Sequence, residues 1–104
     1  MKYHHIGIPT QIPREGEVYL EKFDTHCTDH ESNPWGIQWM RYGKKCPLPR
    51  IVQQVAHVAF QVESLDRALV GKEVIIPPNS PSPGVKVAFI LENGAPVELM
   101  EFID

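Results

Sequence analysis

Short runs of alternating apolar and polar residues recur along this chain, and this pattern predicts a protein built mainly of strands. In the N-terminal half, the pattern predicts strands over residues 2–8, 17–23 and 37–42. The segment 24–33 between the last two is polar and ends in a turn-like Asn-Pro-Trp-Gly run, so it is expected to form a loop. No helical periodicity is present in this half.

The C-terminal half shows the same kind of pattern together with one helix signal. Ser64 is a suitable N-cap, and Leu65, Ala68 and Leu69 follow it at helical spacing. A helix of two turns is therefore expected, with Gly71 as its stop. Strands are predicted over residues 55–62, 72–76, 85–91 and 97–102.

Two prolines, Pro77 and Pro78, interrupt the second of these strands and are expected to end it. The following residues 79–84 are rich in proline, serine and glycine, which predicts an irregular loop. Such a loop could cover a binding site as a lid, but an exposed connection is the simpler interpretation. Residues 92–94, Glu-Asn-Gly, form a hairpin turn between the last two strands.

The strands also contain an internal duplication. Residues 5–8 and 57–60 each begin with a histidine and continue with small and branched residues, and residues 37–42 match residues 97–102 with Gln38 against Glu98. We therefore predict a single domain in three parts. These are a first half over residues 1–43 with its helix reduced to a loop, a connector over 44–54, and a complete second half over 55–104.

Strand alternation places the duplicated polar residues on faces that are otherwise small or apolar. His57 is expected to share its face with Ala59, while Val58 and Phe60 point to the other side and cover the predicted helix. His4 should point away from the face of its neighbour His5. The candidates for pocket walls are the residues that share a face with Gln38 or Glu98, namely Met40, Tyr42, Met100 and Phe102.

Two imidazoles, one carboxylate and one amide oxygen form a ligand set that suits a borderline divalent metal. These ligands would be His5, His57, Glu98 and Gln38. The set carries one negative charge, so a bound dication would keep positive character and act as a Lewis acid. A lone histidine facing a sheet is more often a hydrogen-bonded structural residue, and a lone glutamate at a strand end is usually solvated. The duplicated spacing is what favours the metal interpretation.

The paired histidine strands and paired glutamine or glutamate strands resemble the vicinal oxygen chelate superfamily, which includes glyoxalase I, the bleomycin resistance proteins and the extradiol dioxygenases. The resemblance extends over almost the whole chain and is most specific over residues 57–62 and 85–102. It implies an α+β fold of two βαβββ modules, the first without its helix, whose sheets curl into an open cup. It also implies a divalent metal (zinc, nickel, manganese, cobalt or iron) at the base of the cup, held by His5, Gln38, His57 and Glu98.

The superfamily includes several reactions as well as drug sequestration, so the fold does not select one reaction. The first hypothesis is a short glyoxalase-like lyase or isomerase, or a dioxygenase-type enzyme, which acts on a small substrate with vicinal oxygens. Glu98 would then also transfer a proton. The alternative is a bleomycin-resistance-like binding protein with the same cup and no turnover. In a third hypothesis the duplication serves only the core, and His57→Ala would cost stability alone.

Composition and charge narrow the range of partners. A net charge of -3 over 104 residues argues against nucleic acid. No apolar run approaches the ~20 residues of a transmembrane helix, and the N-terminal residues do not resemble a signal peptide, so a cytoplasmic protein is expected. Cys27 and Cys46 should then be reduced thiols. Cys27 and His30 have a spacing that zinc could use, but no second close pair exists, so a polar loop is the simpler interpretation. A homodimer that covers the sheet edges is expected.

Overall fold

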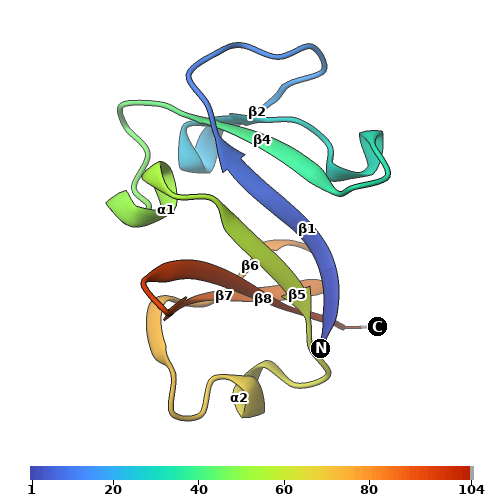
Figure 1. The fold of residues 1–104 in the computed structure, drawn as a ribbon, viewed down its shortest axis with the longest axis vertical. Helices are drawn as coiled ribbons and strands as arrows, with labels where there is room; N and C mark the ends of the chain where they lie inside the picture. The colour runs from blue at the N-terminus through green and yellow to red at the C-terminus, as the bar shows by residue number, and fades with distance from the viewer. Residues whose placement is uncertain (104) are drawn as a thin grey trace.

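A computed structural model describes residues 1–103, and within them the chain forms one eight-stranded sheet with a few short helices (Figure 1). The mixed α+β class, with a predominance of strands, is therefore confirmed. Residue 104, the last position of the predicted second half, lies outside the described part. The strands are β1 (Lys2–Pro9), β2 (Val18–Leu20), β3 (Thr25–Cys27), β4 (Ile37–Tyr42), β5 (His57–Gln61), β6 (Glu73–Ser82), β7 (Val85–Glu92) and β8 (Ala95–Phe102). The helical segments are η1 (Glu21–Phe23), η2 (His30–Ser32), α1 (Arg50–Gln54) and α2 (Leu65–Ala68).

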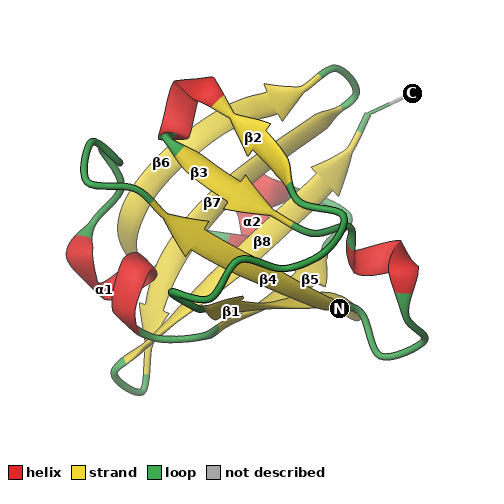
Figure 2. Cartoon of the chain, turned by 90° about the horizontal axis from the view of Figure 1, so that it is seen from above, coloured by secondary structure: helices red, strands yellow, loops and turns green. Residues whose placement is uncertain are grey.

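The strand order is β2-β3-β4-β1-β5-β8-β7-β6, with β1 and β5 as an antiparallel pair at the centre. On one side β1 runs parallel to β4, and on the other β5 runs parallel to β8. Outward from the centre, the first half contributes β1, β4, β3 and β2, and the second half contributes β5, β8, β7 and β6. Each half therefore places its first strand at the centre, then its last strand, then the two between in reverse order. The sheet is strongly curled (Figure 2), so that the two halves face each other across a concave side. The duplication in the sequence corresponds to this repeated strand order.

The convex side of the second half is covered by α2. Ser64 caps this helix by accepting a hydrogen bond from the Arg67 amide, and Glu101 Oε1 accepts another from the Leu65 amide at 2.7 Å. The predicted cap and apolar residues are both present, but the helix spans only Leu65–Ala68, about one turn in place of the expected two. The core beneath the helix consists of Leu65, Ala88, Ile90 and Leu99, with Phe60, Val62, Ala68, Leu69 and Val97 packed against it.

Two segments that the sequence predicts to be a loop and a connector each contain a short regular element. The segment 24–33 contains β3, whose Thr25 is 1% exposed and donates a hydrogen bond from Oγ1 to the Phe23 carbonyl at 2.8 Å. The connector contains α1, which buries Val52 completely. Both elements are too short to produce a periodic pattern, and β3 is polar because its buried threonine finds a backbone partner.

The strand predicted over residues 72–76 was expected to end at Pro77 and Pro78. This prediction is wrong, because the corresponding strand β6 continues to Ser82. Its register with β7 shifts three times, on either side of Ile76 and again after Asn79. β6 is an edge strand with one partner. The nitrogen of a proline, which has no N–H to donate, can therefore face away from that partner without the loss of a ladder hydrogen bond. The segment 79–82 is thus strand and not a loose loop. No helix among the described residues is long and apolar enough to cross a membrane.

Candidate metal centre

The hydrogen-bonded register places the predicted ligands in two adjacent rows across the centre of the sheet. Residues that pair laterally on neighbouring strands point to the same face. One row reads Gln38 on β4, Gly7 on β1 and His57 on β5; the other reads His5 on β1, Ala59 on β5 and Glu98 on β8. Each row therefore has one histidine at one end, a small residue in the middle, and an amide or carboxylate at the other end.

The small residue in each row leaves space for an imidazole. A Cβ atom on Gly7 would lie 2.7 Å from His57 Nε2, far inside normal contact distance, so the His57 ring lies directly over Gly7. In the other row Ala59 pairs with His5 and is completely buried. The histidine of one half therefore lies opposite the small residue of the other half. This explains why a small residue stands two positions after each histidine in the sequence.

His5, His57 and Glu98 converge at one point and are all buried, with 5%, 3% and 8% of their surface exposed. Glu98 Oε1 lies 3.3 Å from His5 Nε2 and 3.2 Å from His57 Nε2. In a tetrahedral centre with metal–ligand bonds near 2.1 Å, neighbouring ligand atoms lie about 3.4 Å apart. The two contacts to Glu98 are close to this spacing, and the three ligand atoms all lie within 4.8 Å of one another, so the side chains suit a divalent metal in donor type and in arrangement.

The electrostatics of the site keep Glu98 ionised. Burial acts to raise the pKa of Glu98, but hydrogen bonds from His5 and His57, together with the positive charge that these rings can carry, outweigh it. The pKa of Glu98 is thereby held at about 2, below its ordinary value. A carboxylate that stays charged while nearly inaccessible to water is a strong ligand for a cation.

Above these three residues lies a cavity of about 260 Å³ whose walls are mainly apolar. Burial raises the pKa of Tyr42, so its hydroxyl remains neutral in this wall. Among the described residues, no lysine and no arginine belongs to the lining. It comprises the three converging residues together with Gln38, His4, His30, Thr25, Cys27, Asn79, Leu20, Phe23, Met40, Tyr42, Leu48, Val52, Ile76, Pro81, Val87, Phe89 and Met100.

Of the remaining candidates from the sequence, four line the cavity and one does not. Met40, Tyr42 and Met100 line the cavity, as does Gln38 at the opposite end of the Gly7 row from His57. Phe102 does not line it: the residue lies at the last pair of β8 with β7, is 46% exposed, and places its ring 5.5 Å from that of His4. Residues 79 and 81 form part of the cavity wall through strand β6, where the sequence suggested an exposed connection.

His4 lies on the cavity side, although simple alternation places it on the opposite face from His5. The register between β1 and β5 shifts between Tyr3 and His5, where β1 advances by two residues while β5 advances by one. This β-bulge turns His4 inward. His4 Nδ1 lies 2.8 Å from His5 Nδ1, and burial, together with the charges of His5 and His30, lowers the pKa of His4.

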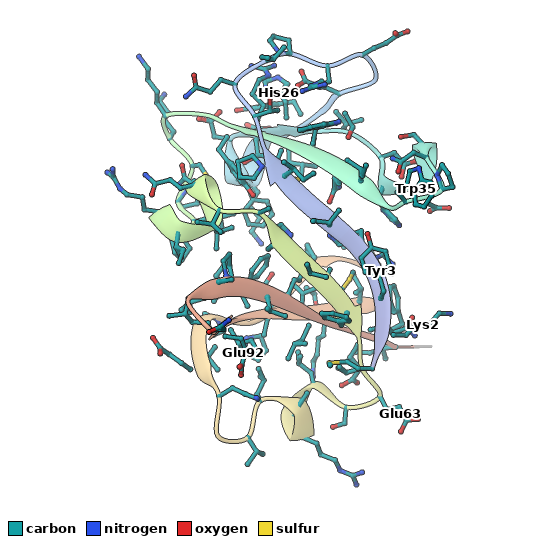
Figure 3. The ribbon with its side chains drawn as sticks, viewed as in Figure 1. Lys2, Tyr3, His26, Trp35, Glu63 and Glu92 are labelled. Carbon is teal, nitrogen blue, oxygen red and sulfur yellow. The ribbon has the colours of Figure 1, made fainter. Side chains whose placement is uncertain are left out.

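His30 completes a group of imidazoles at this side of the cavity, with its ring centroid 4.6 Å from that of His4. The sequence indicated His30 only as part of a zinc-like spacing with Cys27, for which a polar loop was the simpler interpretation. Cys27 lies in the same wall, but among the described residues no cluster of three or more metal-binding side chains includes it. Both cysteines are free thiols. Trp35 is 71% exposed and lies at the periphery of the molecule (Figure 3).

Comparison with known proteins assigns no family. The chain matches no protein-family model, and a search of curated proteins gives no match. The function has to be inferred from the site itself.

The contact between Gly7 and His57 gives a direct test of the site geometry. Gly7→Ala should push the His57 ring away from Glu98 and weaken zinc binding by about tenfold or more, in the range seen when ligand orientation is disturbed. Titration calorimetry with zinc measures this, with circular dichroism to establish that the fold is retained. Ile8→Ala, one residue further on the opposite face, is the control. Zinc binding by Gly7→Ala as tight as that of the unaltered protein would contradict the geometry.

Proposed function

We propose that this chain is a divalent-metal-dependent enzyme of the glyoxalase-like type, a lyase, isomerase or dioxygenase that acts on a small substrate with vicinal oxygens. The observation that supports it most strongly is the convergence of His5, His57 and Glu98 from three strands at the floor of an apolar cavity. Nothing in the packing of the sheet requires a charged carboxylate at that point. A group of apolar side chains would fill the same space at lower desolvation cost.

We further propose that the two halves of the sheet are the paired modules of the vicinal oxygen chelate superfamily, the first without its helix. The repeated strand order about the β1–β5 pair supports this, and so do the two matching rows of residues. Gln38 occupies in the first half the place that Glu98 occupies in the second. It is therefore the fourth ligand of the proposed centre.

A metal held by these four residues would polarise a substrate oxygen and stabilise negative charge that develops on it. Nitrogen and oxygen donors suit zinc, nickel, manganese, cobalt or iron. Glu98 is the residue we assign to proton transfer. A carboxylate that can leave the metal becomes free to accept a proton, so this role requires Glu98 to dissociate from the metal during the reaction.

The cavity narrows the substrate class. Its volume of about 260 Å³ lies just below that of pockets for drug-sized molecules, which span roughly 300–1,000 Å³. No lysine or arginine lines it, so a substrate with several negative charges would find no counter-charge besides the metal. We expect a small molecule with an aromatic or aliphatic body, such as a catechol or a small dicarbonyl compound, in place of a large anionic conjugate.

The alternative is a binding protein that holds such a molecule without converting it. The apolar walls, with Phe23, Met40, Phe89 and Met100 among them, favour this reading as much as they favour catalysis. The two functions differ in whether the bound molecule is converted, a step that would depend on Glu98 in the enzyme. Homodimer formation through the free edge strands β2 and β6 stays a prediction.

Metal content is the first property to measure. Protein purified without chelators or nickel resin should contain about one divalent ion per chain, and His57→Ala should contain almost none while keeping its fold. His26→Ala is the matched control, because His26 lies away from the cavity on β3 (Figure 3) and should leave the metal content unchanged. Protein without metal, and without a thermal shift on addition of zinc, nickel, manganese, cobalt or iron, would refute the proposal.

Turnover separates the enzyme from the binding protein. Metal-loaded protein should convert a member of a panel of catechols, dicarbonyls and hemithioacetals, and Glu98→Gln should lower kcat/KM by about 10²-fold or more. Glu92→Gln, at an exposed glutamate paired with Lys72, controls for the loss of a carboxylate. Tight binding of a panel member with no conversion would instead favour the binding protein.

A further inference from the structure

We propose that His4 is a positioning residue of the metal centre, which accepts a hydrogen bond from His5 Nδ1 and so fixes His5 Nε2 as the ligand atom. The proposal rests on the metal-binding function set out above. It concerns a residue that strand alternation would place on the other face and that only the bulge in β1 brings to the site.

The 2.8 Å contact between the Nδ1 atoms of His4 and His5 can hold only one proton. One ring must therefore donate and the other accept. A histidine that binds a metal through Nε2 carries its proton on Nδ1. His5 must then be the donor and His4 the acceptor, with the proton of His4 on its own Nε2.

The two histidine ligands are oriented by different means. His57 is fixed by shape, since its ring lies over Gly7 and meets the Phe89 ring edge-on with centroids 4.9 Å apart. Its Nδ1 is buried and has no hydrogen-bond partner among the described residues. His5 lies across its row from Ala59, and its ring lies 5.4 Å from the His30 ring and 5.8 Å from the His57 ring between centroids. These ring contacts do not select a nitrogen, so the hydrogen bond with His4 at Nδ1 is what leaves Nε2 facing Glu98. Partners of this kind, which hold the second nitrogen of a ligating histidine, typically raise metal affinity by about 10- to 100-fold.

The hydrogen bond should reverse when metal binds. In the free protein Glu98 Oε1 accepts from His5 Nε2 at 3.3 Å, so a neutral His5 carries its proton there and accepts at Nδ1 from His4. On metal binding the Nε2 proton of His5 leaves to solvent, the shared proton moves from His4 to His5, and His4 takes up a proton at Nε2. The two rings together carry two protons before and after, so the pair gains no charge.

Two substitutions at position 4 separate hydrogen bonding from packing. Asparagine places an oxygen near the position of the histidine Nδ1, whereas leucine is closer in volume to histidine but cannot accept. His4→Leu should weaken zinc binding by about 10- to 100-fold, and His4→Asn should restore affinity to within a few-fold of the unaltered protein. His26→Leu serves as the control and should have no effect. Zinc alone is the probe, in competition with a chelator of known affinity.

The tautomers give a second, independent readout. Long-range ¹H–¹⁵N spectra at about pH 8 should show His5 protonated at Nε2 in the free protein. With zinc, His5 should be protonated at Nδ1 and His4 at Nε2. Zinc-bound His5 protonated at Nε2 would overturn the proposal.

The outcomes also separate the role of His4 from the metal-binding proposal on which it rests. If the unaltered protein binds zinc and His4→Leu binds it equally tightly, or if His4→Asn binds more weakly than His4→Leu, the role of His4 is refuted and the metal centre stands. If the unaltered protein binds none of the five metals, the metal centre is refuted, and the role of His4 with it.

Discussion

The candidate metal centre depends on the sharing of one buried carboxylate, that of Glu98, between the imidazoles of His5 and His57. A charge in this position is strongly unfavourable unless several donors or a cation surround it. The two histidines come from the central strands β1 and β5, one from each half of the chain. The charged centre thus lies where the halves meet, and Gly7 and Ala59 are small because each lies opposite an imidazole.

The same arrangement divides the cavity into a polar floor and apolar walls. The floor holds nitrogen and oxygen donors whose spacing suits a divalent ion, and the walls offer contacts to an uncharged body but no positive side chain. A bound cation would therefore be the main source of positive charge available to a ligand. This asymmetry is the physical basis for proposing a small substrate that is recognised through its oxygens.

The sequence predicted the central strands, the α2 helix and the convergence of histidine and carboxylate, because these depend on alternation and on a duplicated pattern. It did not predict the path of β6 through Pro77 and Pro78, which is tolerated only because β6 is at the edge of the sheet. Nor did it predict that His4 faces the cavity. A bulge is a property of the pairing between two strands, so the alternation of a single strand carries no signal for it.

The central claim is that His5, His57 and Glu98 hold a metal ion together. The most direct measurement is a crystal structure of the zinc-loaded protein, with anomalous data collected on both sides of the zinc absorption edge. We predict one strong anomalous peak about 2.0–2.2 Å from His5 Nε2, His57 Nε2 and a Glu98 oxygen, with Gln38 as the further protein ligand. A peak elsewhere, or none at this site in crystals grown with excess zinc, would contradict the claim.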